Sequence, residues 1–360
     1  MRVLFVYKYL TMGGVETVLR SRLEGLHERG FEAHSWFLFD GPGRVIFTEF
    51  EDKVHIGREE ALYQHLRDVD YDVVSSLDTE EIFPLLRRSS IQSKFVIEVH
   101  TPYPENQEYL GLTRRIPVAA YFVPSWFQAT VVRKKVGESA ELRIVPNPLG
   151  ESFVCGLEEF HPSPRKPVVA WIGRLDEVKN WKEFIEIADQ IERRSMDVEF
   201  WVVGRNGAEV EEKLFTHARK TGVLPRMRWF RGLPYTHMPR LLDAVRDSGG
   251  VVVSTSRGDS FGMTVAEAMA RACAVIVPSK GPFSEFVNDH EHGFAYEVGA
   301  SKLGADRVET LIEDHDLRAK FGADGRESIL KTHSPEVALE VLVKELRRVI
   351  GEEQSEPIVD

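Results

Sequence analysis

The chain has 360 residues, which is long for one ordinary domain and suits two domains of typical size. Hydrophobic residues make up 42% and charged residues 29%, a balance typical of a globular protein. The formal net charge of −11 argues against nucleic acid as the main partner, because nucleic-acid binders usually carry a basic excess. No apolar run approaches the roughly 20 residues of a membrane span, and no signal peptide precedes the first predicted strand. With only two cysteines as well, the sequence indicates a cytoplasmic protein.

Strands and helices alternate along the first half of the chain. A strand, a glycine turn and a helix come first, and the helix shows apolar residues at helical spacing. Such alternation predicts a parallel sheet with helices on both faces. Strands are predicted at 2–7, 31–39, 72–74, 95–99 and 121–123, and helices at 15–29 and from Ser125 onward.

The alternation restarts after a proline-rich segment at 161–167, which has the composition of a linker. We therefore expect two domains, 1–162 and 163–333, followed by a helix and a polar tail in 334–360. Two open sheets of this kind place ligands at the carboxyl ends of their strands, and we expect a cleft between the domains. In the second half, strands are predicted at 168–172, 199–203, 250–253 and 274–277, and helices near 181–194, 208–220, 237–246 and 262–271.

The strongest candidate for chemistry is the segment 254–270, where a strand enters a polar loop and a helix begins near Phe261 and Gly262. A helix start offers unpaired N–H groups and a positive dipole end, which suit a phosphate. Asp259 and Glu267 lie just over two helical turns apart, so their carboxylates could bond sugar and ribose hydroxyls. Taken alone, a capped helix with solvated acids is about as good an interpretation.

Two cations, Arg174 and Lys179, follow the strand 168–172 on one loop. Fixed cations can stabilise a departing diphosphate in place of a metal ion. The alternative is an ordinary pair of surface cations with no ligand, but their position at the carboxyl end of a strand favours a role in binding.

In the first half, the turn at Gly13 and Gly14 is either a plain turn or a loop whose backbone reaches phosphates. It lacks the G-x-G-x-x-G spacing of a dinucleotide site. His100 ends the strand 95–99, where we expect it to face the cleft. The sequence shows no metal-binding cluster and no D-x-D pair after a strand, so no metal and no cofactor are expected.

Over nearly its whole length the chain resembles the family-4 retaining glycosyltransferases, which have the GT-B fold of two Rossmann-like domains facing a cleft. The similarity is densest in residues 168–298, and six elements occur in order at suitable spacing. The elements are Gly13-Gly14 with Glu16, 145–148, 173–175 with Lys179, 230–233, 256–270, and 281–287 with Gly293.

The resemblance implies metal-independent transfer of a sugar from a nucleoside-diphosphate sugar to an acceptor hydroxyl, with retention by a front-face path. Arg174 and Lys179 would bind the diphosphate, and Glu267 the ribose. As the catalytic residues, Asp259 would contact the donor sugar and His100 would lie near its C6 hydroxyl. The donor-binding set is Gly13, Gly14, Arg174, Lys179, Gly204, Gly232, Leu233, Phe261, Gly262, Met263, Thr264 and Glu267.

The chain departs from the family pattern at four places that bear on the site. Position 259 is Asp where Glu is usual, Asn180 stands where glycine is usual, 271–273 replaces small residues and glycine, and Gly281-Pro282 replaces a usual glycine pair. These departures leave the donor open. They leave open two other functions as well, a non-catalytic nucleotide-sugar-binding protein and a nucleotide-sugar epimerase on the same fold.

The sequence does not name the acceptor, which could be a sugar, a lipid-linked sugar or a natural-product aglycone. Acceptor contacts are expected in the loops 40–58 and 101–115, whose aromatic residues could stack on it or simply pack. Basic clusters favour solvated helix ends over a peripheral membrane patch. The aromatic residues are Phe47, Phe50, Tyr103 and Tyr109, and the clusters lie at 87–88, 114–115 and 133–135.

Overall fold

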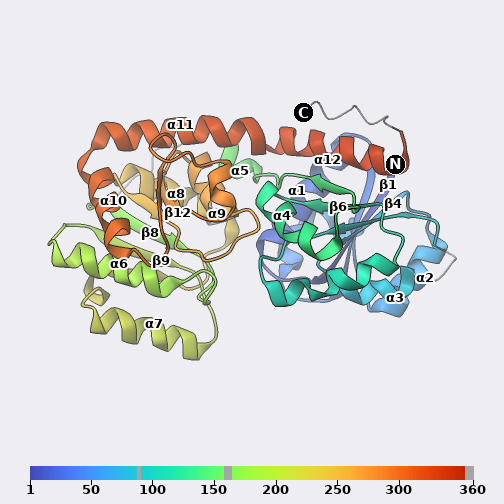
Figure 1. Ribbon diagram of the computed structural model, residues 1–360, viewed down its shortest axis with the longest axis horizontal. Coiled ribbons are helices and arrows are strands. Elements are labelled where there is room, and N and C mark those ends of the chain that lie inside the picture. The colour runs from blue at the N-terminus through green and yellow to red at the C-terminus, as the bar shows by residue number, and fades with distance from the viewer. Residues whose placement is uncertain (87–90, 158–163, 353–360) are drawn as a thin grey trace. The chain divides into compact units, whose positions relative to one another are not determined.

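The computed structural model describes residues 1–86, 91–157 and 164–352 (Figure 1). It divides into two compact units, and each is described by itself. Unit 1 comprises Met1–Gly150 with Thr332–Asp360, and unit 2 comprises Glu151–Lys331. The predicted boundary between residues 162 and 163, the cluster at 87–88 and the end of the polar tail lie outside the described residues. The boundary therefore stays a prediction.

Unit 1 contains a seven-stranded sheet in the order β3-β2-β1-β4-β5-β6-β7, and all of its ladders are parallel. The strands are β1 (Arg2–Tyr9), β2 (Glu32–Phe39), β3 (Val54–Ile56), β4 (Val73–Leu77), β5 (Lys94–Glu98), β6 (Ala120–Val123) and β7 (Leu142–Ile144). The α-helices are α1 (Gly14–Glu28), α2 (Glu59–Asp68), α3 (Phe83–Leu86), α4 (Trp126–Val136) and α12 (Pro335–Ile350).

Alternation along β1 distributes its side chains between two cores, because successive residues of a strand point to opposite faces. Val3 and Phe5 pack with apolar residues of α1 and α12, whereas Leu4 and Val6 belong to the core on the other face. Helix α12 lies close against α1, since a Cβ on Gly25 would fall 2.0 Å from a methyl carbon of Leu339. The last helix of the chain is thus part of the core of unit 1.

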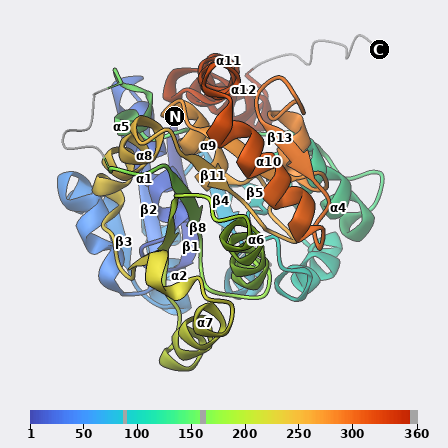
Figure 2. The same ribbon diagram turned by 90° about the vertical axis from the view of Figure 1, so that its left-hand side faces the viewer.

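Unit 2 contains a six-stranded sheet, also parallel, in the order β10-β9-β8-β11-β12-β13. Helices α6 and α10 pack side by side on it (Figure 2), and both contribute to a hydrophobic core shared with the strands. The strands are β8 (Val168–Ile172), β9 (Glu199–Val203), β10 (Met227–Phe230), β11 (Val251–Val253), β12 (Ala274–Pro278) and β13 (Phe294–Tyr296). The helices are α5 (Glu151–Val154), α6 (Trp181–Arg193), α7 (Ala208–Lys220), α8 (Met238–Asp247), α9 (Met263–Ala270), α10 (Ser301–Glu313) and α11 (His315–His333).

The predicted α/β class with parallel sheets is confirmed, and the predicted strands all occur within a few residues of their expected ends. Four outer strands went unpredicted, because three or four residues at a sheet edge carry too little periodicity to stand out. The element 230–233, which resembles a strand beside the nucleobase in the family, takes only Phe230 from β10, and the residues after it form a loop. The missed strands are β3, β7, β10 and β13.

Candidate functional site

In unit 2 the loop after β8 is shaped by a close approach of two glycines. Gly204 has φ +151°, and a Cβ there would fall 1.8 Å from the carbonyl oxygen of Gly173. Only glycine fits such a position. The N–H of Gly173 donates to the carbonyl of Val203 at 2.9 Å, which extends the β8–β9 ladder into the loop. Gly204 therefore has a packing role that fixes the start of the 173–180 loop.

A second loop, which follows β11, is held against the first one by a buried threonine. The indole N–H of Trp171 donates to Thr255 Oγ1 at 2.9 Å, and Thr255 Oγ1 lies 3.0 Å from the carbonyl oxygen of Lys179 and 2.9 Å from that of Asn180. The backbone N–H of Arg257 donates to Val178 at 2.7 Å. These bonds fix the two loops to each other at the carboxyl edge of the sheet.

The same arrangement brings together two of the predicted site residues. Lys179 Nζ lies 2.7 Å and 2.9 Å from the two carboxylate oxygens of Asp259. The side chains are mostly buried, with 19% of Lys179 and 11% of Asp259 exposed. Although 80 residues separate them in sequence, they form one partly desolvated ion pair. Both charges are compensated within the pair.

The other predicted cation is placed differently. Arg174 lies on the same loop, but its side chain is 64% exposed, and its Nε atom is 3.4 Å from Asp176. Such an exposed contact contributes little to stability. The two predicted cations of this loop therefore differ in exposure, Arg174 being mostly exposed and Lys179 mostly buried.

Helix α9 begins at the third predicted element of the site. Gly262 precedes it with φ +97°, where a Cβ would fall 2.5 Å from the ring of Phe283. No side chain caps this helix start, so its first N–H groups, including those of Met263 and Thr264, suit an anion. Phe261 is buried, with its ring centroid 5.1 Å from that of Phe286. Its aromatic packing anchors the turn that leads into the helix.

Glu267 lies one turn into α9 and is buried, with the hydroxyl of Tyr235 donating to its Oε1 atom at 2.8 Å. Burial raises the pKa of Glu267 to about 7, against the lowering effect of that bond. Sequence reasoning missed Tyr235, because nothing in the order of the residues pairs it with a glutamate on another element. Gly232 and Leu233 lie on the loop after β10, the first exposed and the second half-buried.

In unit 1 the glycine turn leads directly into α1. Gly13 precedes the helix, and the buried Glu16 folds back so that its Oε1 accepts from Thr11 N at 2.6 Å and from Thr11 Oγ1 at 2.5 Å. A Cβ on Gly13 would lie 2.9 Å from the other carboxylate oxygen, whereas Gly14 has open space around it. Glu16 thus holds the turn that carries the two predicted glycines.

His100 follows β5 and is buried, with Nε2 3.1 Å from the carboxylate of Glu98. The loops expected to contact an acceptor form 3₁₀ turns at Pro42–Lys53 and Pro104–Arg115. Phe47 and Tyr109 are buried in the cores beneath them, so for these two aromatic residues the packing interpretation holds.

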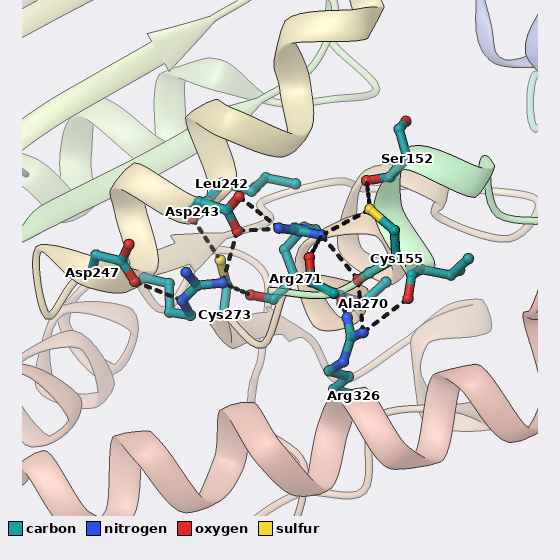
Figure 3. Close-up of polar contacts among 12 residues, drawn as sticks. Ser152, Cys155, Leu242, Asp243, Asp247, Ala270, Arg271, Cys273 and Arg326 are labelled. Carbon is teal, nitrogen blue, oxygen red and sulfur yellow. Dashed lines mark hydrogen bonds and ion pairs between the residues drawn. The ribbon is translucent and has the colours of Figure 1, made fainter. Parts of the chain in front are cut away.

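The departures from the family pattern have clear structural consequences. Asn180 and Ala272 both have φ +57°, the left-handed conformation that glycine adopts without strain. Arg271 is buried and lies 2.6 Å from a carboxylate oxygen of Asp243 (Figure 3). It also donates to the carbonyl of Cys155, as Arg326 does, so both arginines secure the segment that begins unit 2. The roles of Arg271 and Arg326 are structural, and both residues lie outside the paired loops.

Among residues 1–86, 91–157 and 164–352, no group of three or more His, Cys, Asp or Glu side chains is arranged to hold a metal ion. Over the same part of the chain, no helix is both long and apolar enough to cross a membrane. Arg133 and Arg114 donate to backbone carbonyls at or just after the end of α4. These bonds support the interpretation of the basic clusters at 114–115 and 133–135 as helix ends.

Comparison with known proteins now identifies the class of protein. The family model described as "Glycosyl transferases group 1" matches residues 158–328, the range that contains both loops of unit 2. These residues belong to this family, which is glycosyltransferase family 4, and the chain has the GT-B fold. It is a glycosyltransferase of a retaining family that transfers a sugar from a nucleoside-diphosphate sugar.

The individual relatives are distant. Trehalose synthase of Pyrococcus horikoshii is 24% identical over 354 residues, which cover 89% of this chain and 83% of that protein. Poly(ribitol-phosphate) alpha-N-acetylglucosaminyltransferase of Staphylococcus aureus is 27% identical over 193 residues, 52% of this chain and 37% of that protein. Among solved structures, Anabaena Alr3699/HepE in complex with UDP-glucose superposes with a TM-score of 0.84 at 18% identity, over 97% of this chain and 100% of that one.

Proposed function

We propose that this glycosyltransferase takes a nucleoside diphosphate hexose of the UDP-glucose type, and that unit 2 binds it. Similar solved structures contain UDP and UDP-glucose, which supports this choice of donor. Arg174 and Lys179 bind the diphosphate, Glu267 accepts hydrogen bonds from the ribose hydroxyls, and Asp259 contacts the hexose. The start of α9, with Gly262, receives a phosphate or a sugar hydroxyl at its N–H groups.

The observation that carries this proposal is the Lys179–Asp259 pair. A buried cation and a buried carboxylate lie within hydrogen-bond distance at the carboxyl edge of a parallel sheet, where such sheets bind ligands. A nucleoside diphosphate sugar offers each of them a new partner, because its diphosphate is anionic and its hexose carries hydroxyls. An ordinary structural ion pair would have no need of such a position.

The reaction follows from these charges. The acceptor hydroxyl oxygen bonds to the anomeric carbon on the face from which the diphosphate leaves, and the bond from that carbon to the phosphate oxygen breaks. The proton of the acceptor moves to the departing phosphate oxygen, so configuration is retained. Lys179 and Arg174 stabilise the negative charge that develops on the diphosphate, and we propose that no divalent ion is required.

Other assignments complete the proposal. Leu233 and Gly232 line the nucleobase side from the loop after β10, and Gly13 and Gly14 approach phosphate through their backbone. His100 contacts a substrate hydroxyl from the end of β5. The acceptor is a hydroxyl compound recognised by unit 1. We place the activity in the cytoplasm, where the two free cysteines of the described chain would stay reduced.

A thermal-shift screen against UDP, GDP, ADP and dTDP tests the donor assignment. A ligand present at about 100-fold over its dissociation constant should add about 2.7 kcal/mol of stability. The shift should disappear in Lys179→Ala and persist in Lys182→Ala, a matched control in the first turn of α6, directly after the loop, whose exposed ammonium pairs with Glu177 at 2.6 Å. Absence of any thermal shift in folded wild-type protein would remove the donor-site assignment. A separate assay of sugar transfer in the presence of EDTA tests the metal-independent mechanism, which activity that survives EDTA would support.

A further inference from the structure

His100 is held in unit 1 by groups on two neighbouring strand ends. Its Nε2 atom lies 3.1 Å from Oε2 of Glu98, the last residue of β5. Its backbone N–H donates to Asp78 Oδ2 at 3.0 Å, and the hydroxyl of Tyr109 donates to the other oxygen of Asp78 at 3.1 Å. Both the ring and the backbone of His100 are therefore fixed before any substrate arrives.

The carboxylate that faces the ring is ionised. Arg22 of α1 lies 2.7 Å from the same Oε2 atom of Glu98, and the hydroxyl of Ser75 donates to Oε1 at 2.6 Å. Burial by itself would raise the pKa of Glu98, but the charge of Arg22 and the hydrogen bonds from His100 and Ser75 outweigh it and lower the pKa to about 2. An ionised carboxylate only accepts hydrogen bonds, so the ring nitrogen that faces it must carry a proton.

The opposite ring nitrogen is then determined. In a neutral imidazole one nitrogen donates and the other accepts, and the partner of one nitrogen sets the role of the other. With Nε2–H directed at Glu98, Nδ1 is the acceptor. Within the described part of the chain no side-chain or backbone bond to Nδ1 is present, and the residue keeps 8% of its surface exposed.

We infer that Glu98, paired with Arg22, is a positioning residue that presents His100 Nδ1 to the substrate as a hydrogen-bond acceptor. The inference rests on the proposed function, in which His100 contacts a substrate hydroxyl, and it makes that contact specific. The substrate group must donate a hydrogen bond, so a hydroxyl is recognised and a carboxylate at the same position, as in a uronic acid, is disfavoured.

Arg22 gives this arrangement a second consequence. It lies on α1, the helix that begins directly after Gly13, and its guanidinium carbon is 5.7 Å from the ring centroid of Phe5 on β1. Arg22 thus joins α1, the helix that follows the glycine turn, to the strand end that carries His100. A change at Arg22 should disturb both, although Arg22 itself is buried away from solvent.

The first test is the nitrogen-15 spectrum of the His100 ring in wild-type protein at pH 8, assigned by comparison with His100→Ala. We expect a protonated Nε2 and a bare Nδ1. A proton on Nδ1 would overturn the inference whatever the activity of the enzyme. This readout requires no substrate, so it remains decisive if the proposed donor is wrong.

The second test uses two substitutions that each keep one half of the ring. The amide of asparagine occupies the place of Nδ1, and the longer glutamine reaches the place of Nε2. With UDP-glucose as the probe, His100→Asn should retain at least tenfold more kcat/KM than His100→Gln, which should resemble His100→Ala. The reverse order, or full activity in all three variants, would overturn the inference and leave the donor site in unit 2, tested on Lys179, unaffected.

Glu98 itself is tested without leaving a buried charge unpaired. The double variant Arg22→Met with Glu98→Met removes both charges together, which buried pairs often tolerate. It should show a mixture of ring tautomers and a kcat/KM at least tenfold below wild type, while Glu98→Gln, which keeps an acceptor oxygen, should fall between the two. A double variant that is folded, has wild-type kinetics and keeps protonated Nε2 would overturn the role of Glu98.

Discussion

Replacing Asp259 by asparagine should make free UDP bind more tightly while transfer of the hexose is largely lost. In the free protein the ammonium of Lys179 is already neutralised by Asp259, at 2.7 Å and 2.9 Å from its two oxygens. A diphosphate must therefore compete with that carboxylate for the same cation. Asparagine keeps the shape of the side chain but removes the competing charge, so the diphosphate meets an uncompensated cation.

The size of the effect follows from the geometry and burial of the pair. Two unit charges about 4 Å apart interact by about 4 kcal/mol at an effective dielectric near 20. Part of this is lost because the amide oxygen still accepts a hydrogen bond, and because 19% of Lys179 and 11% of Asp259 remain in contact with water. We expect about a third of the Coulomb value to appear in binding, and about 1.4 kcal/mol corresponds to a tenfold lower dissociation constant.

Isothermal titration of UDP and of UDP-glucose at fixed pH and ionic strength measures both parts of this prediction. Glu177→Gln is the matched control, because it removes a carboxylate from the same pair of loops but from an exposed pair with Lys182, so its effect should stay within about twofold. If Asp259→Asn leaves UDP affinity unchanged or weakens it, Asp259 does not compete for Lys179. If UDP-glucose gains as much affinity as UDP, Asp259 makes no favourable contact with the hexose.

Three further predictions rest on other residues. Ala272→Gly should raise the unfolding free energy by about 1 kcal/mol in a urea titration, because it removes the strain of φ +57°. Ala319→Gly, at an exposed position of α11, should lower the unfolding free energy by a similar amount in the same titration. Tyr235→Phe should move the pH midpoint of UDP binding upward from about 7, because in the wild type the hydrogen bond from Tyr235 stabilises the ionised form of Glu267. An unchanged midpoint would disprove the ribose contact. Burial and two neighbouring histidines lower the pKa of His55 to about 4. The unfolded chain therefore binds more protons below pH 6.5, so the unfolding free energy should fall as the pH drops from 6.5 toward 4, and His55→Phe should flatten that slope in urea titrations at a series of pH values.

The sequence was sufficient to predict the architecture because the central strands are continuous apolar runs followed by helices. Strands such as 168–172 and 199–203 were predicted at their observed ends, and the helix predicted from Ser125 begins at Trp126, with Ser125 as its cap. The outer strands were too short to predict. The loops after β8 and β11 could be selected as a site, since both follow the carboxyl ends of central strands.

Contacts between distant segments were beyond the sequence. Lys179 and Asp259 were assigned to different parts of the donor, and nothing in their order along the chain indicated that they pair when no ligand is present. Thr255, which ties their loops together, and Tyr235, which bonds Glu267, gave no signal at all. Each depends on tertiary packing between elements, whereas the periodic patterns that predict strands are local.

The departures from the family pattern show which requirements belong to the backbone and which to the side chain. Asn180 and Ala272 keep the left-handed conformation that glycine usually supplies, so the chain retains the turn and accepts the strain. Asn180 recovers part of the cost because its side-chain amide donates to Glu183 at 2.5 Å, whereas the methyl side chain of Ala272 can form no such hydrogen bond. The turn before α6 is therefore the better supported of the two.

The charges of the free protein suggest how the donor is recognised. The charge of Lys179 is compensated by Asp259, and that of Glu98 by Arg22. Glu267 accepts a hydrogen bond from Tyr235, and its pKa of about 7 leaves it partly protonated at neutral pH. Burying any of these as an isolated charge would be costly, so each has a partner before substrate binds. Under the proposed function, a nucleoside diphosphate sugar would supply replacement partners for the unit 2 groups, a diphosphate for the cation and hydroxyls for the two acids. We therefore expect recognition to depend on an exchange of partners, in which a diphosphate that draws Lys179 away from Asp259 leaves that carboxylate uncompensated unless a hexose is attached.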